Sequence, residues 1–310
     1  MDAARKKIYV AGHRGLVGSA IVRALERRGH DKLLLRTHAE LDLCNQSATR
    51  QFFETERPQI VYVAAARVGG IIANAENQAA FLLQNLQIAC NVIEAAYQYG
   101  AEKLLFLGSS CVYPREAPQP IPEDALLSGP LEPSNEGYAI AKIAGLKLCE
   151  YYNRQQGADF ISAMPCNLYG QNDNFDAHGS HLIPALLRRF HEAKQSGVAS
   201  VTLWGSGTPL REFLYADDLS EACLLLMNNY SEAKTVNIGS GQEYTVKQTA
   251  QLAAQVVGYQ GKILFDTEKP DGTPRKLMDS SSIRAMGWKP KVTLEDGLRM
   301  AYEWYKGEIN

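Results

Sequence analysis

The feature that most constrains the fold is a run of three glycines, spaced three apart from Gly12 to Gly18, between two apolar segments. Lys6–Ala11 before them predicts a buried strand, and the pattern after them predicts a helix to about Arg28, ended by Gly29. A strand, a glycine turn and a helix in this order are typical of dinucleotide-binding proteins, whose glycines let a pyrophosphate approach the helix N-terminus. The spacing is Gly-x-x-Gly-x-x-Gly rather than Gly-x-Gly-x-x-Gly. An ordinary turn is the alternative, which the flanking strand and helix disfavour.

The next predicted strand, Lys32–Arg36, bears on the choice of cofactor. NAD-binding proteins usually place an Asp or Glu at the end of this strand, where it bonds a ribose hydroxyl. Arg36 occupies that end here, and a guanidinium pairs with a 2′-phosphate that a carboxylate would repel. The sequence therefore predicts NADP(H), although Glu40 and Asp42 lie close by. Asp42 is better placed for the adenine end than for the ribose.

Strands and helices alternate along the first half of the chain. Strands are predicted at 60–66, 103–107 and 160–164, with helices at 81–98 and 138–156. Such alternation predicts a parallel, doubly wound sheet, in which ligands lie at the carboxyl ends of the strands. The residues after the strand at 103–107 should therefore face the cofactor.

The regular alternation stops near residue 172. Beyond it, helices are predicted at 182–193, 217–228, 245–257 and 293–305, with a short strand at 201–204. We expect an α/β protein with a doubly wound parallel Rossmann sheet and a smaller mixed C-terminal substrate lobe. Residues 1–172 should form the NADP-binding domain, with 212–236 returning to it, and 173–310 should mainly bind substrate.

Composition excludes several classes of partner. The net charge is −2 and 21% of residues are charged, so no global basic field indicates nucleic acid or a membrane surface. No apolar run approaches the roughly 20 residues of a membrane helix, and Met1–Lys7 does not resemble a signal peptide. The six cysteines are scattered without a Cys-x-x-Cys pair. This favours reduced thiols in the cytoplasm over disulfides, and no metal site is expected.

The main catalytic candidates are Tyr138 and Lys142 on the predicted helix at 138–156. Residues four apart lie on one helix face, and an ammonium beside a phenol is expected to lower the phenol's pKa toward the working range. A Tyr-x-x-x-Lys spacing also occurs on solvated helix faces, so the pair alone is weak evidence. Ser109, after the strand at 103–107, adds a third candidate.

Together these motifs resemble the short-chain dehydrogenase/reductase superfamily, in its extended, nucleotide-sugar-modifying branch. The resemblance spans nearly the whole chain. It is carried by Ala11-Gly-His-Arg-Gly-Leu-Val-Gly-Ser-Ala20, Leu107-Gly-Ser-Ser-Cys-Val-Tyr-Pro114, Tyr138-Ala-Ile-Ala-Lys-Ile-Ala-Gly145, Trp204-Gly-Ser-Gly-Thr-Pro-Leu-Arg-Glu-Phe213 and Lys269-Pro-Asp-Gly-Thr-Pro-Arg-Lys276.

The resemblance implies a bifunctional epimerase and NADPH-dependent reductase that converts GDP-4-keto-6-deoxy-D-mannose to GDP-L-fucose. It implies Tyr138 as proton donor in the reduction, and Cys111 and His181 as base and acid in epimerisation at C3 and C5. It favours Ser109 over its neighbour Ser110, because alternation along an extended chain would put Ser109 beside Cys111. From the residues alone, Cys111 can equally be a small buried hydrophobe. His181 can equally be a helix-entry residue, with His178 as a rival.

The catalytic set implied is Ser109, Cys111, Tyr138, Lys142 and His181. The cofactor-binding set implied is Gly12, His13, Arg14, Gly15, Leu16, Val17, Gly18, Arg36, His38, Asp42, Leu107, Gly108, Ser109, Ser110, Tyr138, Lys142, Pro165, Cys166, Asn167, Leu168 and His181. The candidates for the GDP-sugar are Arg189, Trp204, Arg211, Asp271 and Lys276. Arg189 and Arg188 can also be one solvated patch, and Trp204 can belong to the core. A homodimer through the helices that begin near Phe81 and Tyr138 is expected from the superfamily.

Two other functions fit parts of the pattern. An NAD-retaining 4-epimerase or dehydratase of the same branch would share the fold, but Arg36 and the Cys111/His181 pair disfavour it. A non-catalytic NADP-sensing regulator would be expected to lack part of the Ser109, Tyr138 and Lys142 set, and all three are present.

Overall fold

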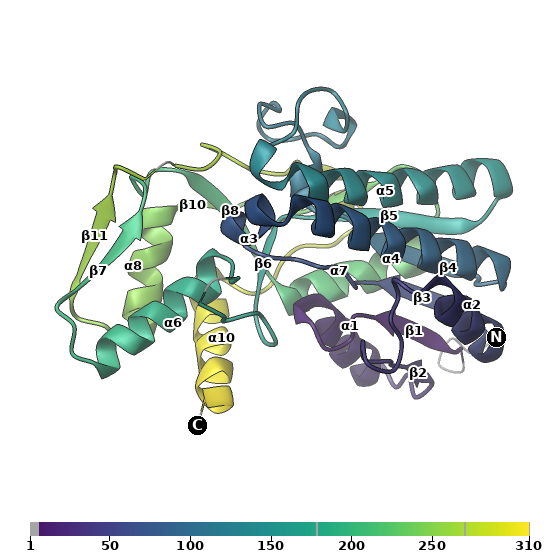
Figure 1. Ribbon diagram of the computed structural model, residues 1–310, viewed down its shortest axis with the longest axis horizontal. Coiled ribbons are helices and arrows are strands. Elements are labelled where there is room, and N and C mark those ends of the chain that lie inside the picture. Colours follow the sequence, from purple (N-terminus) through teal and green to yellow (C-terminus); the bar gives the residue numbers. More distant parts are fainter. Residues whose placement is uncertain (1–5, 178, 270, 310) are drawn as a thin grey trace.

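The computed structural model describes residues 6–177, 179–269 and 271–309, and shows two lobes along the long axis of the molecule (Figure 1). Within the described residues, the larger lobe is built on a six-stranded sheet in the order β2-β1-β3-β4-β5-β9, with every neighbouring pair parallel. These strands are β1 (Ile8–Ala11), β2 (Leu33–Leu34), β3 (Ile60–Val63), β4 (Lys103–Leu107), β5 (Asp159–Pro165) and β9 (Val236–Ile238). The predicted doubly wound parallel sheet is confirmed.

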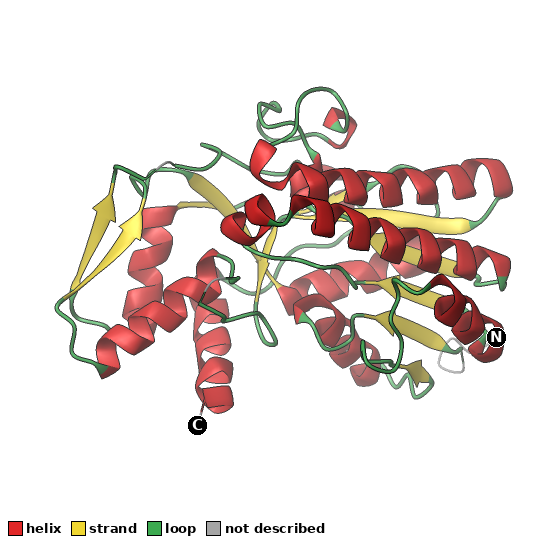
Figure 2. Ribbon diagram, viewed as in Figure 1, coloured by secondary structure: helices red, strands yellow, loops and turns green. Residues whose placement is uncertain are grey.

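Helices cover both faces of this sheet (Figure 2). On one face α4 (Gln78–Gln98) packs on α5 (Glu136–Gln156), with α2 (Gln46–Glu56) against α4. On the other, α1 (Leu16–Arg27) packs against α7 (Ala216–Asn229). The strands β1 and β4 are buried throughout, as expected for a parallel sheet with both faces covered.

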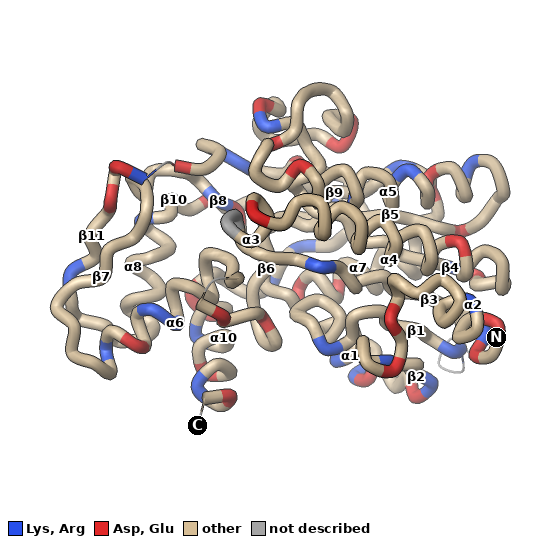
Figure 3. Tube along the Cα trace, viewed as in Figure 1, with Lys and Arg blue, Asp and Glu red and all other residues tan. Residues whose placement is uncertain are grey.

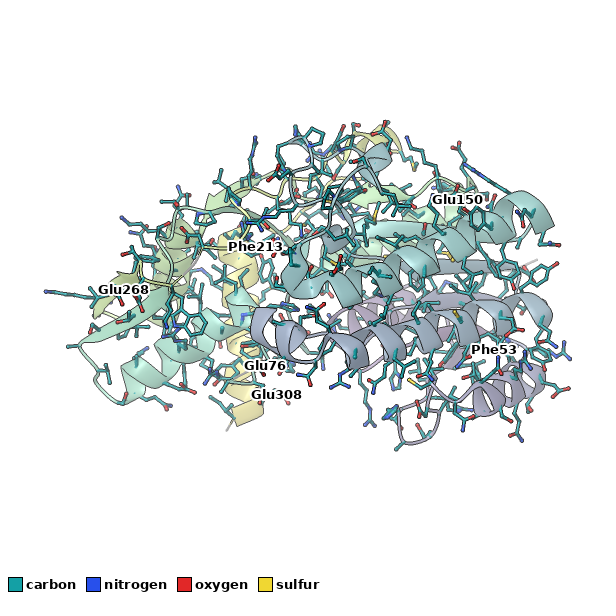
Figure 4. The ribbon with its side chains drawn as sticks, turned by 45° about the horizontal axis from the view of Figure 1, so that its top comes forward. Phe53, Glu76, Glu150, Phe213, Glu268 and Glu308 are labelled. Atoms are coloured by element: carbon teal, nitrogen blue, oxygen red, sulfur yellow. The ribbon has the colours of Figure 1, made fainter. Side chains whose placement is uncertain are left out.

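The smaller lobe has a core of its own, formed by α6 (Leu182–Gln195), α8 (Val246–Val257) and α10 (Leu294–Ile309). The strands β7 (Ser200–Trp204) and β11 (Lys262–Asp266) pair in parallel at the far end of this lobe. In Figure 4, Glu268 lies near this end of the molecule and Phe53 lies near the opposite end, in the larger lobe.

A three-stranded sheet lies between these parts. The strand β8 (Leu210–Tyr215) pairs in parallel with β6 (Asn167–Tyr169) and antiparallel with β10 (Glu243–Thr245). After β8 the chain returns to the larger lobe through α7 and β9. The division of function at residue 172 and the return of 212–236 to the cofactor domain stay predictions.

Several elements differ from those expected. The helices α2, α3 (Ile71–Glu76) and α9 (Ser281–Ala285) were not predicted, nor were β6, β8, β9, β10 and β11. The strand β2 has only two residues, so Arg36 lies beyond it. The end predicted for the helix at 138–156 is confirmed, because Gly157 caps α5 with φ of +67°.

Candidate active site

The glycine turn forms a cradle with no room for a side chain at Gly12 or Gly18. Gly12 has φ of +82°, and a Cβ at Gly18 would lie 2.1 Å from the Gly12 carbonyl oxygen. The helix α1 begins after Gly15 without a side-chain cap or an acidic residue in its first turn, so its N–H groups remain for an anion. The Nδ1 atom of His13 is buried without a hydrogen-bond partner among the described residues. The turn therefore fits a dinucleotide pyrophosphate.

Arg36 is held in place by contacts that the sequence did not suggest. Its Nη1 donates to the Leu35 carbonyl (3.0 Å), its Nη2 donates to Glu56 Oε1 (2.8 Å), and its guanidinium lies 5.6 Å from the ring centre of Phe52. Arg14 is exposed at the glycine turn. Arg36 therefore already has a carboxylate partner, Glu56 of α2, in addition to any contact with a 2′-phosphate.

The two acidic residues near Arg36, Glu40 and Asp42, also have hydrogen-bond partners. Glu40 accepts hydrogen bonds from the backbone N–H (2.7 Å) and hydroxyl (2.8 Å) of Thr37, and these lower the pKa of its carboxyl. Asp42 accepts from the Cys44 N–H (2.9 Å) and lies 3.7 Å from the exposed imidazole of His38. These contacts define one polar edge beside the glycine turn.

Ser109 and Cys111 meet through a tight turn. The predicted extended stretch is wrong, because Ser110–Val112 forms a turn of 3₁₀ helix and Ser110 is buried. The Ser109 hydroxyl accepts from the Cys111 N–H (3.5 Å) and is also a hydrogen-bond partner of the Cys111 thiol. Burial raises the pKa of this thiol, although the ammonium groups of Lys276 and Lys142 oppose the rise.

Tyr138 and Lys142 lie on α5 as predicted, and Ser109 is a hydrogen-bond partner of the Tyr138 hydroxyl. The predicted lowering of the phenol's pKa is wrong, because burial is the largest influence and raises it. The Lys142 ammonium donates to the Leu107 carbonyl (2.7 Å) and lies 5.8 Å from the Tyr138 ring centre. Burial lowers the pKa of Lys142 from 10.5 to about 8.

His181 is the residue directly before α6 and is exposed, although surrounding protein desolvates its ring and lowers its pKa. The segment before it is tied to the larger lobe, since the Gly70 N–H donates to the Gly179 carbonyl (3.1 Å). The rival residue His178 lies outside the described residues.

The chain after β5 borders this site. Pro165 ends β5, and the Cys166 N–H donates to the Ile238 carbonyl of β9 (2.9 Å). The Asn167 side chain donates to the backbone carbonyl of Glu212 (2.9 Å). Half-buried Leu168 packs against the core of the larger lobe. These residues therefore link the edge of the large sheet to β8.

Two basic residues, Lys276 and Arg211, lie close to each other near Cys111. The Lys276 ammonium has no hydrogen-bond or ion-pair partner in the described part of the chain; burial lowers its pKa, and Arg211 lowers it further. The Arg211 Nη1 donates to the carbonyls of Leu210 (2.7 Å) and Thr273 (2.7 Å). Two partly buried cations this close together, with no described carboxylate bonded to either, suit a polyanionic ligand.

Asp271 is engaged within the protein. It accepts from the backbone N–H (2.9 Å) and hydroxyl (2.6 Å) of Ser206, which lower the pKa of its carboxyl. Its contact with Ser206 ties the loop after Pro270, itself outside the described residues, to the turn after Trp204. A role for Asp271 in binding sugar or base stays a prediction.

Arg189 lies on α6, and Trp204 is the last residue of β7. Arg188 pairs with Glu192, whereas the Arg189 Nη2 donates to the Thr202 carbonyl on β7 (2.6 Å), so the two arginines are not one patch. Trp204 is 60% exposed, and the Lys269 ammonium lies 5.8 Å from its ring centre. Trp204 is therefore a surface that a base can stack on rather than a core residue.

Sequence reasoning missed two carboxylates that hold candidate site residues. Glu56 lies on the unpredicted helix α2, for which Asn45 as N-cap was the available signal. Glu212 lies within the motif that ends at Phe213, where a charged residue inside an apolar strand was the signal.

Comparison with known proteins shows the family to which the chain belongs. A model of the NAD dependent epimerase/dehydratase family matches residues 8–239. The chain belongs to this family. Within it, the chain is 62% identical to a putative GDP-L-fucose synthase 2 of Arabidopsis thaliana over 96% of its length and 91% of that protein. It is 52% identical to GDP-L-fucose synthase of Escherichia coli K12, covering 97% of each chain.

A solved structure of the same shape is MlghC, a GDP-mannoheptose C4 reductase from Campylobacter jejuni with NADP bound. The two chains are 39% identical. The match covers 99% of the present chain and 100% of MlghC, and the structures superpose with a TM-score of 0.91. These relatives are enzymes, and the recognition made from the sequence motifs is confirmed.

Proposed function

We propose that this chain is an NADPH-dependent epimerase/reductase that converts GDP-4-keto-6-deoxy-D-mannose to GDP-L-fucose. The observation that carries the proposal is the convergence of three proton-bearing groups, Ser109, Cys111 and Tyr138, at the same edge of the parallel sheet as the dinucleotide cradle. Lys276 and Arg211, which suit a diphosphate, lie next to this cluster. The 52–62% identity to GDP-L-fucose synthases supports the substrate.

The cofactor predicted from the sequence, NADP(H), is supported by the relative that holds NADP. The glycine cradle accepts the pyrophosphate, and Arg36 with Arg14 is proposed to hold the 2′-phosphate. Bound there, NADPH supplies the hydride for C4. Binding of 2′,5′-ADP, compared with ADP, tests this directly. Arg36→Gln should weaken the first and spare the second.

Epimerisation needs acidic protons on C3 and C5, which the C4 ketone provides. Removing one produces an enolate whose charge lies on the C4 oxygen, where Tyr138 and Ser109 stabilise it as hydrogen-bond donors. Cys111 is proposed as the base on one face and His181 as the acid on the other. Since desolvation by the surrounding protein raises the pKa of Cys111 and lowers that of His181, substrate must shift both groups toward their reactive forms.

Reduction uses the same oxygen. The raised pKa of Tyr138 keeps its phenol protonated, which is the form required of a proton donor to the C4 alkoxide. Lys142 acts through its bond to the Leu107 carbonyl, holding α5 against the end of β4. One oxyanion site therefore serves both epimerisations and the reduction.

The direct test is NADPH oxidation with GDP-4-keto-6-deoxy-D-mannose in deuterated water. We expect GDP-L-fucose with solvent deuterium at C3 and C5. A reduced product without deuterium would favour a C4 reductase, the activity named for the Campylobacter relative. Interconversion at C4 without NADPH consumption would indicate a 4-epimerase.

The assembly and location are also proposed. Leu83 and Tyr97 on α4, with Ile140 and Tyr151 on α5, are exposed apolar residues on two packed helices, which supports a homodimer through this face. No described helix is long and apolar enough to cross a membrane. The six cysteines are free in the structure, and we propose a cytoplasmic enzyme.

A further inference from the structure

Glu212 is a fully buried carboxylate, 0% exposed, that no step of the proposed mechanism uses. Its Oε1 accepts from the Gly241 N–H (2.6 Å) and its Oε2 accepts from the Met278 N–H (3.0 Å). The fit is close, because a Cβ at Gly239 would lie 2.4 Å from Oε1. A carboxylate buried at this cost is retained only where its hydrogen bonds are needed.

The three segments bonded to Glu212 come from different parts of the molecule. Gly241 follows β9, the edge strand of the large sheet, and Met278 follows Lys276 by two residues. The Glu212 backbone carbonyl accepts from the Asn167 side chain of β6. Figure 4 places the next residue, Phe213, between the two ends of the molecule. One side chain thus joins the cofactor sheet to the segment that carries Lys276.

That segment is fastened to β8 at further points. The Leu210 N–H donates to the Pro274 carbonyl (2.9 Å), and Arg211 donates to the Thr273 carbonyl (2.7 Å). The bonds at 273 and 274 hold the chain before Lys276, and the Glu212–Met278 bond holds it after. Lys276 is therefore positioned from both sides. Leu277 is also bonded to Gln119 (2.8 Å) and Ile121 (2.7 Å), but Glu212 is the neighbour of Arg211 and so joins both cations to the chain that follows the edge strand.

We propose that Glu212 is a positioning residue that sets Arg211 and Lys276 against the diphosphate of the substrate, at a fixed distance from the cofactor sheet. This inference rests on the proposed function and adds a residue to it. Glu212 does not touch substrate. It acts through the backbone of 239–241 and 276–278.

The experiment is calorimetric titration of GDP and, separately, NADPH into the wild-type protein and Glu212→Gln, well below the unfolding temperature. A glutamine turns one acceptor into a donor facing an N–H group, which breaks one of the two bonds. We expect GDP affinity to fall about tenfold or more and NADPH affinity to change less than about twofold. A purely structural role would lower the unfolding temperature without separating the two ligands.

The matched control is Glu123→Gln. Glu123 is also a buried carboxylate that accepts a backbone N–H, from Asn237 (3.0 Å), but it holds no candidate substrate contact. We expect both affinities to remain at wild-type values. Glu212→Asp, which keeps the charge and shortens the side chain, is measured alongside and carries the comparison if the glutamine variant does not fold.

A double-mutant comparison separates positioning from a general effect. In a Lys276→Met background, Glu212→Gln should cost much less GDP affinity than it does alone, because the group it positions is absent. Equal costs in both backgrounds would overturn the inference. Unchanged GDP affinity in Glu212→Gln would also overturn it while leaving the proposed function intact. Failure of the wild-type protein to bind GDP would overturn both.

Discussion

The two sides of the site differ in what they lack. On the side of the large sheet, the reactive groups of Ser109, Tyr138 and Lys142 already have hydrogen-bond partners, and burial favours the neutral forms of Tyr138 and Lys142. On the side of the smaller lobe, Lys276 and Arg211 are cations without a bonded carboxylate among the residues that the structure describes; Figure 3 shows acidic and basic residues mixed elsewhere along the chain. The first side is prepared for proton transfer, and the second for binding an anion.

The difference predicts that variants on the first side change turnover and variants on the second change affinity. The largest effect is expected for Tyr138→Phe, which removes the proton donor and keeps the ring. Turnover should fall by about 10²–10⁴-fold, while NADPH binding, measured by fluorescence titration, should be preserved. Near-normal NADPH oxidation in this variant would contradict the proposed role of Tyr138.

Lys276→Met tests the second side. Removing a desolvated ammonium should lower GDP affinity by about 10–100-fold, as expected for a charged hydrogen bond to phosphate. The same change should leave the free energy of unfolding unchanged or increase it, because burial disfavours this ammonium. Calorimetry and urea unfolding measure the two quantities. A loss of stability together with unchanged GDP affinity would assign Lys276 to the fold instead.

Cys111→Ser separates the two reactions within the first side. A serine hydroxyl is a far weaker base, so incorporation of solvent deuterium at C3 and C5 should fall more than hydride transfer to a ketone already epimerised. Mass spectrometry of the product measures the first, and NADPH absorbance the second. Cys90→Ser, an exposed cysteine on α4, serves as the control. Unchanged deuterium incorporation would exclude Cys111 as the base.

The smallest effect concerns pH. The pKa of Lys142 is lowered from 10.5 to about 8, so its ammonium is lost as pH rises past about 8, and kcat/KM should decline there. Stability should move the opposite way. Between about 8 and 10.5 the unfolded chain binds more protons at this lysine, so its contribution to the free energy of unfolding rises with pH. Lys142→Met, compared by urea unfolding across this range, should lack that rise.

Local patterns predicted the long helices of both lobes and the central strands better than the short strands that lie between the lobes. The glycine turn, α4, α5 and the central strands follow periodicities that neighbours in sequence create. The short strands β6, β8 and β10 were not predicted from the sequence, because two of them have only three residues and their pairing depends on distant segments. The predicted lysine effect on Tyr138 failed for a related reason. Helical spacing gives the shared face but not the desolvation that dominates the pKa.

The sequence by itself determined the doubly wound sheet, the dinucleotide turn and the candidate catalytic set, since each depends on residue types at short spacing. Only the tertiary structure decided which partners those residues have: Glu56 for Arg36, the Leu107 carbonyl for Lys142, and Glu212 as the link between Met278 and Gly241. Hydrogen bonds and burial join residues far apart in the chain, and no periodicity encodes them.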